Sequence, residues 1–156
     1  MPRIAIAAIV ASLVPPALVS IFGVVASGGH PSGLLFVAAA AWIVGLIHII
    51  FLGLPLFIFL LRRNSLTLAH TAVAGLLTGA LSNAVISYPR TLEGYSSGQN
   101  WHGKYVDIYV NGEPTYYAWL TYAESCVYMG IYGLLTAATA WLVWRSMSET
   151  QEGIDV

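Results

Sequence analysis

Four long runs of apolar residues constrain this chain more than any other feature of its sequence. The runs cover residues 4–26, 34–61, 66–88 and 119–144. Each is long enough to cross the hydrocarbon core of a bilayer, which needs about 20 apolar residues in a helix. Only 8% of the 156 residues are charged, against about 25% in a typical soluble domain. The sequence therefore predicts an all-α membrane protein, a bundle of four transmembrane helices.

Basic residues near the ends of the runs predict how the chain is oriented. Those on one side of the predicted membrane are Arg3, Arg62, Arg63 and Arg145. The long loop on the other side holds Arg90 and Lys104. Because Lys and Arg are enriched in cytoplasmic segments, both termini are predicted to lie in the cytoplasm. The first run also has a tolerable signal-peptide cleavage site, "VVAS", but its length favours an uncleaved helix.

The outer loop, residues 89–118, is expected to be ordered. Its segment "KYVDIYV" alternates in polarity and is followed by Asn111 and Gly112, the strongest short signal for a hairpin turn. The returning arm, "EPTYYAW", contains Pro114, which limits it to an edge strand. A small extracytoplasmic β-hairpin is therefore predicted between the third and fourth helices of a transmembrane domain that covers residues 1–146. Residues 147–156 are polar and acidic and are predicted to be a disordered cytoplasmic tail.

Prolines interrupt the first two runs. Pro15 and Pro16 lie near the middle of the first, where a packed kink or a broken helix that lines a cavity would accommodate them, and we favour the packed kink. The second run would measure about 42 Å as a straight helix, more than the hydrocarbon core of about 30 Å. It must tilt, bend or protrude, and Pro55 in "GLP" is the expected position of a kink because proline cannot donate to the helical ladder.

Small residues recur at helical spacing along the third and fourth runs. The expected packing residues are Gly75, Gly79, Gly130, Gly133 and Ala137. Small side chains let helix backbones approach closely in a membrane, so these positions predict close helix contacts. The single cysteine, Cys126, belongs to the same face and is expected to be a small buried residue rather than a reactive thiol.

Polar residues inside the runs are the candidates for an intramembrane site. They are His48, Ser82, Asn83, Glu124 and Tyr128. Glu124 lies five residues after Trp119, and Asn83 lies five residues before Tyr88. At a rise of about 1.5 Å per residue, both lie about 7 to 8 Å below the outer interface. We expect Glu124 and Asn83 to meet between the third and fourth helices, since an unpaired carboxyl is costly there. A structural hydrogen bond and an ion or proton site are both open, and we favour the structural role.

No cofactor, metal site or catalytic residue is predicted. His48 lies near mid-membrane and His70 near one end of its run, so the two are unsuited to the axial ligation of one haem. An outer zinc site with His30 and His102 is conceivable, but the spacing is not diagnostic. Glu124 with His48 is the sole candidate acid–base pair, and their depths differ. The net charge of -1 and the lack of a basic stripe exclude a nucleic-acid partner.

Three stretches of the sequence resemble a loose group of small four-helix bacterial inner-membrane proteins. They are "GLPLFIFLLRR", "VNGEPTYYAWLTY" and "AWLVWR", and the likeness extends over the second to fourth runs. The resemblance implies a multi-pass location in a bacterial inner membrane. The overall plan is also similar to that of immunity proteins that protect the inner membrane against pore-forming toxins, at the level of topology only.

The sequence thus favours a non-enzymatic inner-membrane protein that acts by binding another membrane protein or a toxin, as an accessory or immunity-type protein. The alternative is an oligomeric ion channel or small transporter, with Ser82, Asn83 and Glu124 near its outer mouth and His48 at mid-depth. The expected partners are the lipid bilayer and either another membrane protein or further copies of this chain.

Overall fold

The computed structural model describes residues 2–26 and 33–152, and its helices follow the four apolar runs. The first run forms α1 (Pro2–Ala11) and α2 (Val14–Ala26). The second forms α3 (Leu34–His48), a π-helical turn η1 (Ile49–Gly53) and α4 (Leu54–Arg62). The third and fourth runs form α5 (Leu68–Ile86) and α6 (Tyr116–Glu152). Within the described residues, these runs supply four helical segments that are long and apolar enough to cross a membrane.

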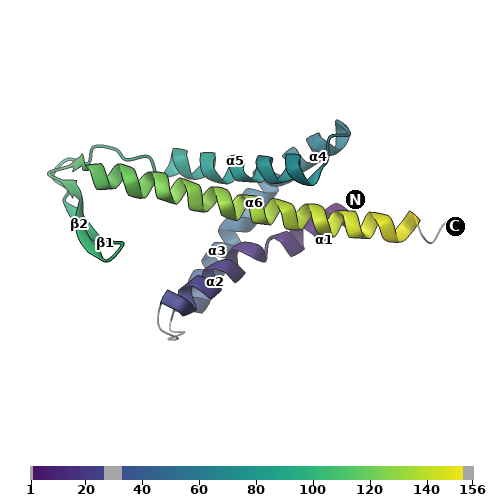
Figure 1. Ribbon diagram of the computed structural model, residues 1–156, viewed down its shortest axis with the longest axis horizontal. Coiled ribbons are helices and arrows are strands. Elements are labelled where there is room, and N and C mark those ends of the chain that lie inside the picture. The colour runs from purple at the N-terminus through teal and green to yellow at the C-terminus, as the bar shows by residue number, and fades with distance from the viewer. Residues whose placement is uncertain (1, 27–32, 153–156) are drawn as a thin grey trace.

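The helices are arranged as two pairs (Figure 1). α5 and α6 lie antiparallel and in contact, and α2 packs against α3 as the second pair. The contact between α1 and α6 joins the two pairs. Toward the end of the molecule that carries the small sheet, the α2–α3 pair diverges from α5 and α6. The N-terminus, the end of α4 and the C-terminal half of α6 lie together at the opposite end (Figure 1).

The prolines of the first run begin a new helix. α1 ends at Ala11 and α2 begins at Val14, so Pro15 and Pro16 fall in the first turn of α2. A proline costs little there, because the first N–H groups of a helix have no intrahelical acceptor. The break is tied to α3 by Trp42, whose Nε1 donates to the Oγ of Ser12 in the break at 3.1 Å. The first run is thus a broken helix rather than the packed kink that we favoured.

The proline of the second run follows a π-helical turn. η1 ends at Gly53, and the N–H of Leu54 bonds to the carbonyl of Ile49, five residues earlier. Pro55 then occupies the first turn of α4. Because Pro55 has no N–H to donate, the wider turn before it rearranges the hydrogen bonds that a straight α-helix would lose. The irregularity expected at "GLP" is therefore present, as a π-helical turn.

A three-stranded antiparallel sheet connects α5 to α6. Its strands, in the order in which they pair, are β1 (Ser97–Trp101), β2 (Lys104–Val110) and β3 (Glu113–Pro114). The predicted turn at Asn111 and Gly112 is present, with φ values of 50° and 89°, and the strand after it is short because it reaches Pro114 at once. The sequence did not predict β1, which pairs with β2 through a second turn at His102 and Gly103, with φ values of 48° and 81°.

α6 is longer than predicted. It runs from Tyr116 to Glu152, so the part of the expected disordered tail up to Glu152 is helical, and residues 153–156 lie outside the described residues. An ion pair of 2.7 Å between Arg145 and Glu149, one turn apart, supports this extension. The 37 residues of α6 measure about 55 Å, well beyond the hydrocarbon core of about 30 Å. α6 must therefore protrude from any bilayer that it crosses.

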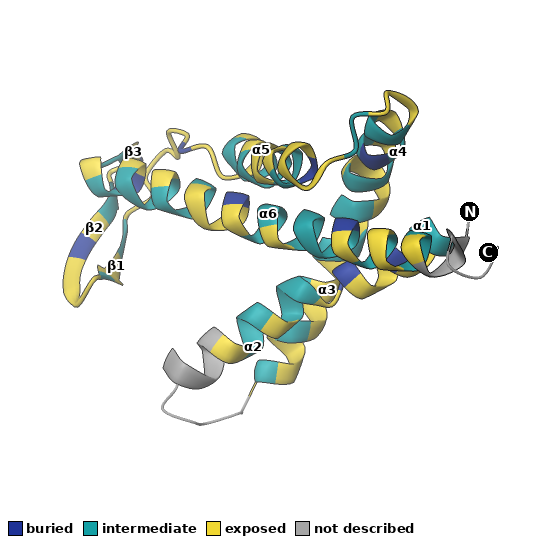
Figure 2. Ribbon diagram, turned by 45° about the vertical axis from the view of Figure 1, so that its right-hand side comes forward, coloured by how far each residue is buried: buried dark blue, intermediate teal, exposed yellow. Residues whose placement is uncertain are grey.

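Few of the described side chains are buried within the chain itself (Figure 2). The buried residues are Ala7, Ala11, Ser12, Phe57, Thr71, Pro89, Val106, Gly112, Ala118, Gly130 and Trp141. Large apolar side chains such as Leu35, Phe36 and Val85 instead cover the outer surfaces of the helices. A soluble monomer rarely exposes so much continuous apolar surface, whereas lipid would cover it at no cost.

Candidate functional site

α5 and α6 touch backbone to backbone at their glycines. Between these helices the structure places the five expected packing residues, Gly75, Gly79, Gly130, Gly133 and Ala137. A Cβ atom added at Gly75 would overlap the carbonyl of Gly133, and one added at Gly133 would overlap the carbonyl of Gly75. A Cβ at Gly79 would overlap the carbonyl of Met129. The small-residue pattern thus corresponds to a contact that larger side chains would prevent.

Asn83 extends this contact toward the sheet. Its Nδ2 donates to the Oγ of Ser125 at 2.9 Å and approaches the Sγ of Cys126 at 3.5 Å, both on α6. Its Oδ1 accepts a hydrogen bond from the hydroxyl of Ser87 at 3.1 Å. Cys126 is a half-buried part of this contact, and Asn83 fixes the register of the two helices through side chains of α6.

Glu124 does not meet Asn83, so that prediction was wrong. Successive residues of an α-helix point about 100° apart. Because Ser125 faces α5, Glu124 beside it faces a different direction. The estimate of equal depth therefore could not show that Glu124 and Asn83 lie on facing surfaces.

The tip of the β1–β2 hairpin holds Glu124 instead. Trp101 Nε1 donates to Glu124 Oε2 at 2.9 Å, and the hydroxyl of Tyr128 donates to Oε1 at 3.1 Å. His102 Nε2 lies 3.2 Å from the same Oε1. The ring of Trp101 also packs edge-on against Tyr117, with 5.4 Å between ring centroids. This cluster, which we call the Glu124 clamp, attaches the tip of the sheet to the side of α6.

The outer face of the sheet displays tyrosines. Side chains alternate along β2, and Val106, which is buried, faces the opposite way from Tyr105 and Tyr109. Tyr105 is 70% exposed, and its ring crosses Gly98 of β1, where an added Cβ would meet the Tyr105 hydroxyl oxygen at 2.5 Å. Tyr109 packs edge-on against Tyr95, with 5.5 Å between centroids. Gly98 thus leaves room for an aromatic ring that stands against the strand surface.

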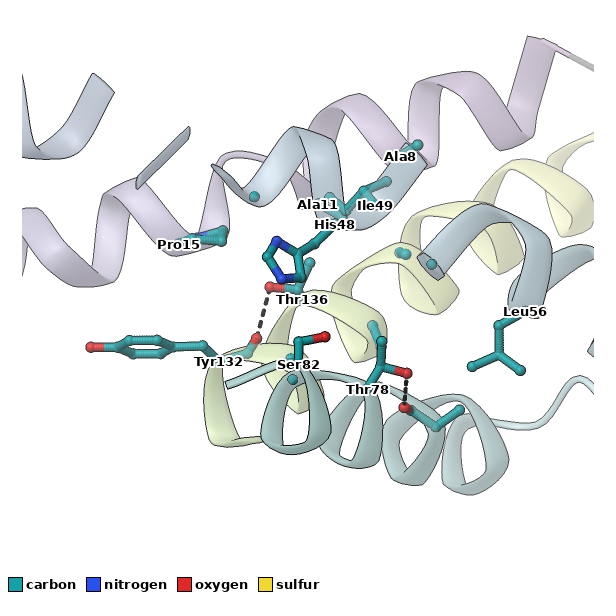
Figure 3. Close-up of a pocket in the computed structure, with 18 of the residues that line it drawn as sticks. Ala8, Ala11, Pro15, His48, Ile49, Leu56, Thr78, Ser82, Tyr132 and Thr136 are labelled. Atoms are coloured by element: carbon teal, nitrogen blue, oxygen red, sulfur yellow. Dashed lines mark hydrogen bonds between the residues drawn. The ribbon is translucent and has the colours of Figure 1, made fainter. Parts of the chain in front are cut away.

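A cavity of about 420 Å³ lies between the two helix pairs. Its walls are mostly apolar, and its polar lining residues are His48, Thr71, Thr78, Ser82, Asn83, Tyr132 and Thr136. The ring of His48 reaches from α3 toward Thr136 of α6, while Thr78 and Ser82 approach from α5 (Figure 3). The structure thus brings together three predicted site residues, His48, Ser82 and Asn83, and places the other two, Glu124 and Tyr128, at the clamp.

One hydrogen bond defines the chemistry of His48. Its Nδ1 lies 2.8 Å from the carbonyl oxygen of Val44, one turn earlier in α3. A carbonyl oxygen can only accept, so Nδ1 carries the proton, and Nε2 of the neutral ring is an acceptor. No side chain or backbone group of the described residues donates to Nε2.

The remaining histidines do not form a metal site in the described part of the chain. There, no group of three or more His, Cys, Asp or Glu side chains is placed to hold a metal ion. His70 belongs to the start of α5, where its N–H donates to Thr67 Oγ1 at 3.2 Å and its Nδ1 lies 2.9 Å from the same oxygen. His102 belongs to the clamp, and His30 lies outside the described residues.

Comparisons of the chain with protein families, with curated proteins and with solved structures found no match. The resemblance to small bacterial inner-membrane proteins therefore stays a prediction.

Proposed function

We propose that this chain is a multi-pass protein of a bacterial inner membrane that acts without catalysis, by binding another membrane protein through its sheet. Four long apolar helical segments support the membrane location. Aromatic side chains mark both ends of the proposed span, with Tyr88 against Tyr122 at 6.0 Å between centroids near the sheet and Trp141 near the other end. The segment of α6 from Tyr122 to Trp141 measures about 28 Å, close to the hydrocarbon thickness of about 30 Å.

The distribution of basic residues supports a cytoplasmic location for both termini. The N-terminus, the end of α4 and the C-terminal half of α6 share one end of the molecule, opposite the sheet (Figure 1). Their basic residues are Arg3, Arg62, Arg63 and Arg145. Under the positive-inside rule this end faces the cytoplasm, so the sheet faces outward. A partner that approaches from outside the cell membrane would meet the sheet first, which fits accessory and immunity-type roles.

The observation that carries the proposal is a firmly attached sheet with a prearranged aromatic surface. The Glu124 clamp holds the tip of the sheet on α6, and the N–H of Gly112 bonds to the carbonyl of Tyr95 at 2.7 Å near its other end. Tyr105 is largely exposed yet lies across Gly98. Tyrosine offers a large contact area for few rotatable bonds, and an anchor held in place before binding loses little further entropy.

Photo-crosslinking in cells tests this surface. A benzoylphenylalanine at Tyr105 should yield a discrete adduct with a second membrane protein. The matched control carries the same label at Lys104, the adjacent residue, whose side chain points to the opposite face of β2. An adduct from position 105 that weakens in a Gly98→Val background, where the added side chain displaces the aromatic ring of the label from the strand surface, would support the proposal. Equal labelling at both positions, or none at either, would refute it.

The same experiment separates the alternative function. An oligomeric channel or small transporter predicts adducts between copies of this chain rather than with a different protein. Adducts between copies of the chain, together with cation flux in liposomes that contain the purified chain, would refute partner binding and support the channel or transporter function.

A further inference from the structure

We propose that the cavity between the helix pairs binds a neutral, lipid-soluble phenol, a class that includes quinols, whose hydroxyl donates a hydrogen bond to Nε2 of His48. This inference does not depend on the sheet surface. It rests on the volume of the cavity, on the hydrogen-bonding state of its polar groups and on its lack of charge.

The size and walls of the cavity suit a small hydrophobic molecule. Its volume of about 420 Å³ falls within the range of about 300 to 1,000 Å³ that is typical of ligand sites. Small residues from several helices line the cavity and leave its space unfilled, among them Ala8, Ala11, Ala41, Gly45 and Ala140. The α2–α3 pair diverges from α5 and α6 (Figures 1 and 2), and the cavity is lined by residues of both pairs.

Several polar atoms that line the cavity can accept a hydrogen bond but have no donor near them among the described residues. His48 presents Nε2 as an acceptor, since Nδ1–H is used by its own helix. Thr78 and Thr136 each donate their hydroxyl hydrogen to a carbonyl of their own helix at 2.7 Å, so their oxygens retain lone pairs (Figure 3). Among the described residues, Ser82 makes no hydrogen bond through its hydroxyl. A ligand that fits this set brings at least one strong donor.

Charge limits the ligand further. None of the described residues that line the cavity is Asp, Glu, Lys or Arg. A phosphate, a carboxylate or the propionates of a haem would therefore lose their hydration without gaining a counter-charge. A neutral molecule avoids that cost. A phenolic hydroxyl is a stronger donor than an aliphatic one because its proton is more acidic, and the ring and its tail match the apolar walls.

Two probes that differ by one donor test the proposal. The chain in lipid nanodiscs is titrated with para-nonylphenol and with para-nonylanisole, a methyl ether of nearly the same shape that has no O–H. We expect the phenol to bind about five- to tenfold more tightly, the effect of one hydrogen bond. We also expect the phenol, and not the ether, to shift the ¹⁵N resonance of His48 Nε2.

A pair of histidine variants locates the effect. His48→Phe keeps a ring but removes the acceptor, so the two probes should then bind with equal affinity. His70→Phe, at an exposed histidine outside the cavity, should leave the preference for the phenol unchanged. Equal binding of both probes to the unaltered chain, no saturable binding of either, or an unchanged preference in His48→Phe would overturn the proposal. The ¹⁵N shift of His48 Nε2 is measured on the unaltered chain, so it tests the proposal even if a variant fails to fold.

Discussion

Replacing Gly133 by alanine tests how closely α5 and α6 approach. The added methyl group would overlap the backbone carbonyl of Gly75, which cannot move unless α5 itself moves. Overpacking of this kind costs about 1–3 kcal/mol. Alanine is also a better helix former than glycine by about 1 kcal/mol, which offsets part of that cost. We therefore expect Gly133→Ala to lower the free energy of unfolding by up to about 2 kcal/mol.

Gly130→Ala is the matched control, because it makes the same change on the same helix. There the nearest atoms to an added Cβ are the Leu76 carbonyl oxygen at 3.3 Å and the Ala80 Cβ at 3.4 Å, so a shift of a few tenths of an ångström relieves the contact. The gain in helix propensity should then dominate, and we expect a stability that is unchanged or raised by up to about 1 kcal/mol.

The decisive quantity is the difference in the free energy of unfolding between Gly133→Ala and Gly130→Ala. The gain in helix propensity from glycine to alanine is the same in both variants and cancels in this difference. It should amount to about 1–3 kcal/mol. Unfolding in mild detergent by added dodecyl sulfate, followed by tryptophan fluorescence, measures it. Gly133→Leu should be less stable than Gly133→Ala in the same assay. If Gly133→Ala and Gly130→Ala unfold at the same dodecyl sulfate fraction, the backbone contact between the helices is not what stabilises the pair.

Three further outcomes check the fold and its orientation. Reporter fusions at Asn100 and at the C-terminus should report opposite compartments, and a shared compartment would contradict the proposed topology. Trp101→Phe keeps an aromatic ring but removes the N–H that donates to Glu124, so protease cleavage at the β1–β2 turn should accelerate several-fold, and an unchanged rate would argue against the clamp. Trp42→Phe removes the hydrogen bond to Ser12 and should lower stability in detergent by about 1 kcal/mol; a stability equal to that of the unaltered chain would show that this bond contributes nothing.

Features that depend on neighbours in the chain were predictable from the residues alone. The four apolar segments follow from run length, because a helix satisfies its own backbone hydrogen bonds wherever it lies. The turn at Asn111 and Gly112 follows from the positive φ values that this dipeptide tolerates. The glycine faces follow from helical periodicity, since residues three and four apart share a face whatever packs against it. Gly75 and Gly133 could therefore be assigned to packing faces before their partners were known.

Features that depend on which surfaces face each other required the tertiary structure. Depth along a helix can be counted in the sequence, but rotation relative to a neighbour cannot, so Glu124 and Asn83 matched in depth and still pointed to different partners. The strand "SGQNW" has no alternating pattern and becomes a strand only by pairing with β2, which brings Trp101 to the carboxylate. The cavity around His48 exists because two helix pairs diverge. That divergence is set by contacts between segments distant in sequence, which no local pattern encodes.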